Sequence, residues 1–186
     1  MIAANLKKGS LLIAEPSIIG DYSFARTVIL LAEHTKEGSV GFIINKPMKY
    51  SLNDLVPEIH ATFPIFDGGP VEKDNLYFIH NIPELIPNSI EISEGIFWGG
   101  DYELTKNLIN NGVIQSENVR FFLGYSGWET HQLEIEMKTN AWIISENPYK
   151  SKLIEKSATD FWKEKLIELG GDYILWSNAP ENPSFN

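Results

Sequence analysis

The sequence predicts an α+β fold rather than a doubly wound α/β fold. Short apolar runs rich in Val, Ile and Phe outnumber the helical patterns along the 186 residues, and the two kinds are not regularly interleaved. No internal repeat, low-complexity segment or linker divides the chain, which predicts a single domain over residues 1–186. The residues after about 178 are rich in Pro and Asn, so we expect a disordered tail there.

The predicted strands are short apolar runs bounded by charged or turn-forming residues. A run of four to eight such residues is typical of a strand that is buried on at least one face. The predicted strands cover residues 10–14, 26–32, 40–45, 76–80, 90–92, 96–98, 120–124 and 141–145.

Two longer helices are indicated by side chains that can accept hydrogen bonds from the first N–H groups of a helix. Asp101 caps one predicted helix, which Gly112 ends. Ser157 and Asp160 have the capping-box spacing and precede apolar residues that repeat at helical spacing as far as the glycines at 170–171.

Two shorter segments are also interpreted as helical. Ser51 and Asp54 bracket a short first turn. The apolar residues of 132–140 alternate as in a strand, but Leu133 and Met137 also lie one helical turn apart. We favour a helix there because Gln, Leu, Glu, Met and Lys all suit one.

Charge and composition exclude several classes of function. The chain has no cysteine, which excludes thiolate catalysis, iron–sulfur clusters and zinc ribbons. Its net charge is −10, and residues 51–129 alone hold three Lys/Arg against twelve Asp/Glu. We interpret this acidic middle as a solvated surface, with a cation site or a basic protein partner as the alternative. The few cations are scattered rather than clustered, so we expect no direct binding to nucleic acid.

The sequence predicts a soluble, cytoplasmic protein that does not bind membranes. No apolar stretch approaches the roughly 18 residues that span a bilayer. The apolar run at 11–14 is shorter than the about 7–15 residues of a secretory signal core. The lack of cysteine suits a reducing compartment. The oligomeric state is not indicated by the sequence.

Residues 120–128 read RFFLGYSGW, in which an apolar run meets two glycines and two bulky aromatic residues. That pattern predicts a buried strand that feeds a tight, crowded turn. Together with QLE at 132–134, it is similar to the signature of the AlgH/YqgE family. Five further segments resemble the same family in the same order: GSLLIAEP at 9–16, FARTVILL at 24–31 followed by Glu33 and His34, GSVGFIINKP at 38–47, GGPV at 68–71 and WGGD at 98–101.

The resemblance covers roughly residues 9–145 and implies a mixed β-sheet with a small barrel-like part, surrounded by helices. Members of this bacterial family are often labelled transcriptional regulators, after one linked to alginate production. That label names an effect on a pathway and assigns no chemistry. The chain departs from the family pattern at Glu129-Thr130-His131, where the family favours a glycine-rich turn.

Ser126 lies in a context that resembles a nucleophile elbow, G-x-S-x-G. Trp128 replaces the second glycine of that motif, and the family resemblance also allows Ala in place of Ser126. We therefore predict no catalytic serine and interpret Tyr125 and Trp128 as walls of the core or of a cleft.

Metal spacing is absent among the four histidines, so we expect no metal and no cofactor. His80 ends an apolar strand, and we expect it to be hydrogen-bonded and partly buried.

The remaining candidate residues belong to strand ends and glycine-rich turns, where ligand sites are common. Lys46 can contact an acidic ligand, and the planar guanidinium of Arg26 suits a carboxylate, with an ion pair to Glu33 favoured over a ligand. Backbone N–H groups at 68–71 and 98–101 can face an anion, although a tight turn and the Asp101 cap explain them as well. The candidate ligand-binding residues are Arg26, Asn45, Lys46, Gly69, His80, Gly100, Asp101, Tyr125, Ser126 and Trp128.

Three functions are compatible with these features. The first is a non-enzymatic regulatory or interaction protein with a protein or small-molecule partner, which the lack of a complete catalytic constellation favours. The second is an enzyme whose site lies in a cleft between the turns at 68–71, 98–101 and 124–128. The third is a DNA-binding regulator, which the negative charge opposes.

Overall fold

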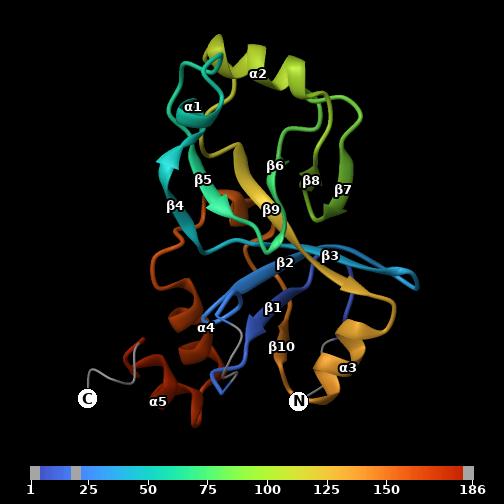
Figure 1. Ribbon diagram of the computed structural model, residues 1–186, viewed down its shortest axis with the longest axis vertical. Coiled ribbons are helices and arrows are strands. Elements are labelled where there is room, and N and C mark those ends of the chain that lie inside the picture. Colours follow the sequence, from blue (N-terminus) through green and yellow to red (C-terminus); the bar gives the residue numbers. More distant parts are fainter. Residues whose placement is uncertain (1–4, 18–21, 182–186) are drawn as a thin grey trace.

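The protein is described by a computed structural model that covers residues 5–17 and 22–181 (Figure 1). The strands are β1 (Leu11–Ala14), β2 (Val28–Thr35), β3 (Gly38–Ile43), β4 (Pro47–Ser51), β5 (Pro64–Asp67), β6 (Val71–His80), β7 (Ile90–Ser93), β8 (Ile96–Trp98), β9 (Val119–Glu129) and β10 (Trp142–Ser145). The helices are α1 (Leu52–Leu55), α2 (Tyr102–Asn110), α3 (Gln132–Lys138), α4 (Phe161–Leu169) and α5 (Tyr173–Ser177), with a 3₁₀ helix, η1 (Lys150–Glu155). Figure 1 shows α1 and α2 at one end of the molecule and α3, α4 and α5 toward the other.

The ten strands of the described residues form one connected, mixed sheet. Its order is β10-β1-β2-β3-β9-β6-β8-β7, and β5 also pairs with β9 and carries β4. The β5–β9 pairing is parallel and the others are antiparallel. The predicted α+β class is confirmed. The path ends at β10 and β7, so the sheet is open, and the barrel-like part that the resemblance implied is not a closed barrel.

Strand β9 joins two halves of the sheet: β10, β1, β2 and β3 form one half, and β4, β5, β6, β8 and β7 form the other. The length of β9 also shows that one prediction was wrong. Its first part pairs with β5 and β6, and its last four residues, 126–129, pair with β3. The turn predicted at 124–128 is therefore wrong, because the chain stays extended through Glu129. Gly124 has φ +68°, and this single left-handed residue bends the strand where it passes from one half of the sheet to the other.

One other predicted strand begins later than expected, and two strands were not predicted. The strand predicted at 26–32 begins at Val28, because Arg26 has φ +56° and cannot continue a strand. β4 and β5, which carry Pro47 and Pro64 at their first positions, were not predicted as strands. β4 is mostly exposed and lacks an apolar run, so its pattern resembles a loop.

All four predicted helices are present, but one predicted cap is wrong. Asp101 caps α2 by accepting a hydrogen bond from the N–H of Leu104 at 2.9 Å. α1 and α3 are also helical, as predicted. The capping box predicted at 157–160 is wrong: Asp160 has φ +59° without a capping hydrogen bond, and α4 begins only at Phe161.

Three clusters of buried apolar side chains hold the sheet to its helices. One contains Phe42 and Phe122 and packs α4 and η1 against the sheet. A second, containing Phe121, packs beside α1 and α2. The third, containing Trp128 and Trp142, lies beside α3. The predicted tail after about 178 falls mainly on residues 182–186, which are outside the described residues.

Candidate functional site

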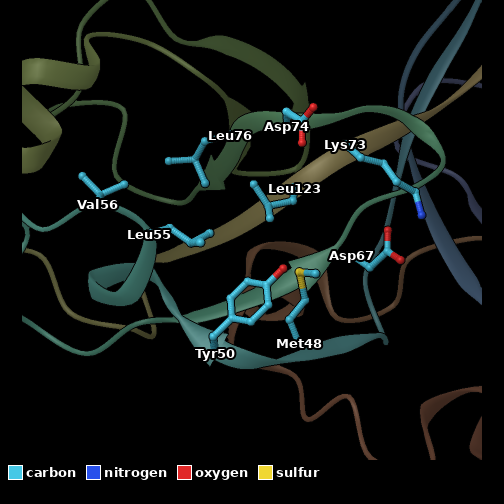
Figure 2. Close-up of a pocket in the computed structure, with 9 residues that line it drawn as sticks. All are labelled: Met48, Tyr50, Leu55, Val56, Asp67, Lys73, Asp74, Leu76 and Leu123. Atoms are coloured by element: carbon cyan, nitrogen blue, oxygen red, sulfur yellow. The ribbon is translucent and has the colours of Figure 1, made fainter.

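A groove of about 530 Å³ lies between α1 and the strands β4, β5, β6 and β9 (Figure 2). Sites for small molecules commonly have about 300–1,000 Å³, apolar walls and a few polar groups that fix orientation. The groove has this character. Its apolar and aromatic side chains come from β4, α1 and the turn after it, β6 and β9: Met48, Tyr50, Leu55, Val56, Leu76 and Leu123.

Three charged side chains make one side of the groove polar. Figure 2 shows Asp67 and Lys73 at the end away from Val56, with Asp74 above them. One carboxylate oxygen of Asp67 accepts the backbone N–H of Gly69 at 3.1 Å, which fixes the orientation of this side chain. The second carboxylate oxygen of Asp67 makes no hydrogen bond within the described residues.

The groove continues along β4 into a second hollow of about 560 Å³. The two share Met48, Tyr50 and Asp67, and the second adds Asn45 and Lys46. Both of these added residues were predicted as ligand-binding.

A third hollow, of about 420 Å³, brings together Arg26, Asn45 and Lys46. Trp162 and Lys163 of α4 complete its wall. These three residues, which the sequence predicted as ligand-binding, thus line one hollow. Asn45 and Lys46 are consecutive, and Arg26 lies almost twenty residues before them in the sequence.

The bonds of these three residues are mostly structural. Asn45 accepts the N–H of Val28 at 2.8 Å and donates to the carbonyl of Arg26 at 2.9 Å, so its amide extends the β2–β3 ladder. Arg26 donates to the carbonyl of Ala179 at 2.7 Å and lies 5.2 Å from the ring centre of Trp162. The predicted ion pair of Arg26 with Glu33 is wrong. The ammonium of Lys46 donates to the carbonyl of Ser23 at 2.6 Å.

Tyr125 and Trp128 line a different hollow, of about 660 Å³, beside Glu33 and Glu129. Trp128 is only 5% exposed, and its indole N–H donates to Glu136 at 2.9 Å. Tyr125 is half-buried and therefore offers more of its ring to a ligand than Trp128 does.

His80, Gly100 and Asp101 serve the fold around the end of β6. His80 is fully buried, its Nε2 lies 3.0 Å from the carbonyl oxygen of Gly99, and its Nδ1 accepts the N–H of Ile82 at 3.3 Å. Burial lowers the pKa of His80 below its usual 6.5, so the ring is neutral at pH 7. At Gly100 a Cβ would lie 2.8 Å from a backbone carbonyl oxygen, so a side chain has no room there.

Ser126 and Gly69 hold the bend of β9 against the turn that follows β5. Ser126 is fully buried, and its hydroxyl donates to the carbonyl of Gly68 at 3.1 Å. A Cβ on Gly69 would lie 2.3 Å from the backbone of Tyr125. The two segments therefore pack backbone against backbone, which explains why both are rich in glycine.

We expect no covalent labelling of Ser126 by a fluorophosphonate, because its hydroxyl is buried and bonded to a carbonyl. Mass spectrometry of the treated protein would measure this. Labelling of the wild type that Ser126→Ala abolishes would contradict it. The same substitution should cost about 1 kcal/mol of stability through the lost hydrogen bond.

The groove in Figure 2 was not anticipated from the sequence. Met48 and Tyr50 belong to β4, which was not predicted as a strand, and Leu55 lies on the four-residue helix α1. The only available signal was that apolar side chains alternate with Pro47 and Lys49, which is the pattern of a half-exposed strand.

In residues 5–17 and 22–181, no group of three or more His, Cys, Asp or Glu side chains is arranged to hold a metal ion. Within the same ranges no helix has the length and apolar character needed to cross a bilayer.

The chain belongs to the AlgH-like family, whose sequence model matches residues 11–174. It is 42% identical over 183 residues to a UPF0301 protein of Bacteroides thetaiotaomicron, covering 96% of this chain and 91% of that protein. It is 38% identical over 182 residues to a UPF0301 protein of Chlorobaculum tepidum, covering 97% of this chain and 96% of the relative. The predicted family resemblance is confirmed.

Solved structures share the fold. The solution structure of the AlgH protein from Pseudomonas aeruginosa has a TM-score of 0.71 at 25% identity and covers 94% of this chain and 95% of its own. The crystal structure of protein DIP2367 from Corynebacterium diphtheriae has a TM-score of 0.77 at 19% identity, covering 96% and 95%. These likenesses extend over nearly the whole chain, so the open sheet described above is the architecture of the family fold.

Proposed function

We propose that this protein is a non-enzymatic, cytoplasmic binding protein that acts through a small-molecule ligand held in the groove of Figure 2. The observation that carries the proposal is the composition of the groove, in which apolar walls meet three charged side chains on one side. A regulatory effect, as the family label suggests, would then follow from occupancy of this groove.

The placement of the reactive side chains favours binding over catalysis. Ser126 and His80 are fully buried and use their polar atoms in hydrogen bonds to the backbone. Arg26 lines one hollow and Tyr125 another. An enzyme needs a nucleophile or base that can reach its substrate, and these groups cannot reach a common substrate without rearrangement.

The groove suits a small amphipathic molecule. Leu55, Leu76 and Leu123 offer an apolar surface for an uncharged body. Asp67 and Lys73 place an acceptor and a donor at the polar end, so a ligand end with both hydrogen-bond donors and acceptors fits best.

A fluorescence titration with N-phenyl-1-naphthylamine, an uncharged apolar probe, tests the proposal. The wild type should show a saturable increase in fluorescence. Leu55→Asp should weaken binding by about tenfold, because it removes apolar contact and places a carboxylate in the groove wall. Leu55 is 42% exposed, so this variant should still fold.

Val113→Asp is the matched control, because Val113 is 51% exposed and lies after α2, outside the groove. It should bind the probe as the wild type does. Equal affinity in all three proteins would place the probe elsewhere and contradict the proposal.

We expect no direct binding to DNA. The net charge is −10, and the hollow that holds Arg26, Lys46 and Lys163 also contains Asp160 and Glu181. Fluorescence anisotropy with a mixed-sequence duplex at about 50 mM salt favours binding and is therefore a strict test. Saturable sub-micromolar binding that weakens steeply with salt would support a DNA-binding regulator instead.

A further inference from the structure

Arg120 is a buried cation without a carboxylate partner in the described part of the chain. Its side chain is 6% exposed, and its guanidinium lies 4.4 Å from the ring centre of Phe66. One Nη1–H donates to the carbonyl of Ile44 at 2.8 Å, and one Nη2–H donates to the carbonyl of Lys156. A guanidinium has five N–H donors. The others have no acceptor among residues 5–17 and 22–181.

The other deeply buried cation of the described chain shows what Arg120 lacks. Lys165 is 2% exposed, and its ammonium pairs with the carboxylate of Glu168 at 2.6 Å. Among residues 5–17 and 22–181, no acid lies within 4.0 Å to play this role for Arg120. Burial alone lowers the pKa of Arg120 to about 10, with no compensating negative charge, and the group is still charged at pH 7. A buried ion without a counter-charge is costly, so an anion would find a prepared partner here.

A hollow of about 310 Å³ opens beside this guanidinium. Phe66 and Ala158 form apolar parts of its wall, and Ser116 and Ser157 bring hydroxyl groups. The hydroxyl of Ser157 accepts the N–H of Thr159 at 3.3 Å, which leaves its own proton free to donate. The volume is at the lower end of the range for small-molecule sites, so it admits a small anion.

We propose that this hollow binds the carboxylate or phosphate group of a small anion, with the guanidinium of Arg120 as its principal partner. The planar fork of N–H groups matches the two oxygens of either group. The site is separate from the groove of Figure 2, because the two share no lining residue.

Two carboxylates at the rim oppose an anion and give the proposal a second test. Glu117 and Glu155 line the hollow and are exposed to solvent, where salt screens their repulsion. Glu155→Gln should therefore tighten anion binding about threefold. Glu58→Gln, which removes an equally exposed carboxylate outside the hollow, should leave the affinity unchanged.

The side-chain Nε–H signals in a proton–nitrogen correlation spectrum provide the direct test. The chain contains only two arginines, Arg26 and Arg120, so Arg26→Lys assigns both signals. Inorganic phosphate and acetate are titrated separately into the wild-type protein at constant ionic strength. Because Arg120 itself is not substituted, the titration does not disturb the fold. The Arg120 signal should shift saturably, and the shift should be larger than that of Arg26.

Each result decides the proposal. Saturation with acetate alone assigns a carboxylate ligand, and saturation with phosphate alone assigns a phosphate ligand. An Arg120 signal that does not move would overturn the proposal. Shifts of both arginine signals that grow linearly without saturation would also overturn it, because they indicate weak, non-specific contact. Tightening by Glu155→Gln but not by Glu58→Gln places the anion in this hollow, and equal behaviour of the two variants contradicts that placement.

Discussion

Gly124→Val should destabilise the protein by about 2–6 kcal/mol, which is a large part of the stability of an ordinary domain. Gly124 has φ +68°, a conformation that strains a β-branched residue. Its Cβ would also lie 2.6 Å from the carbonyl oxygen of Gly69 and 2.8 Å from that of Val71. Both oxygens belong to the backbone and cannot move without disturbing the joint between the halves of the sheet. Urea unfolding measures the effect.

Substitutions at two further glycines distinguish backbone strain from steric contact as the cause of this loss of stability. Gly112→Ala should cost about 1–2 kcal/mol. Gly112 has nearly the same φ, +70°, but apart from its chain neighbours no atom of the described residues lies within 4 Å of a new Cβ. Gly127→Ala should stay within about 1 kcal/mol, because its nearest contact is the ring edge of Tyr125 at 3.2 Å. Gly124→Ala should exceed both. If Gly124→Ala costs no more than Gly112→Ala, close backbone packing is not what requires glycine at this bend.

Glu136→Ala should destabilise the protein by about 2–5 kcal/mol. One carboxylate oxygen of Glu136 accepts the indole N–H groups of Trp128 at 2.9 Å and of Trp142 at 2.7 Å. The two indoles are 5% and 4% exposed, so both donors would be left buried without an acceptor. This carboxylate ties α3 to β9 and β10, and its loss should also loosen the edge of the sheet. The change in the urea midpoint is the measurement.

Glu134→Ala is the matched control, because the side chain of this glutamate of the same helix makes no hydrogen bond within the described residues. It should change stability by no more than about 0.5 kcal/mol. Glu136→Gln keeps a carbonyl oxygen and should recover part of the loss. Equal effects of Glu134→Ala and Glu136→Ala would show that helix propensity, rather than the indole hydrogen bonds, determines the result.

The fold could be predicted where burial follows the local pattern. The apolar runs of β1 and β3 are largely buried strands because nothing non-local competes with their pattern. The continuation of β9 could not be predicted, because Gly124 and Gly127 resemble a turn until the backbone of Gly69 is known to pack against Gly124. The predicted cap of α4 was also wrong: Asp160 adopts a left-handed φ of +59°, which the capping-box spacing does not indicate.

The candidate site depends even more on contacts between distant segments. The sequence pointed to Asn45 and Lys46, which the structure places where two hollows meet. The groove itself combines Leu55 with Leu123, and no pattern in one segment indicates that these two side chains share a wall (Figure 2). Gly68, Gly69 and Gly124 were prominent in the sequence, and close backbone packing at the bend of β9 requires them.

Native mass spectrometry after incubation with a bacterial small-molecule extract tests the central claim most directly. The wild type and Val113→Asp should retain the same small molecule, and Leu55→Asp should lose it. The retained molecule should be recovered chemically unchanged, because the protein is proposed to bind rather than to convert it. Equal retention by Leu55→Asp, or recovery of a converted molecule, would contradict the account.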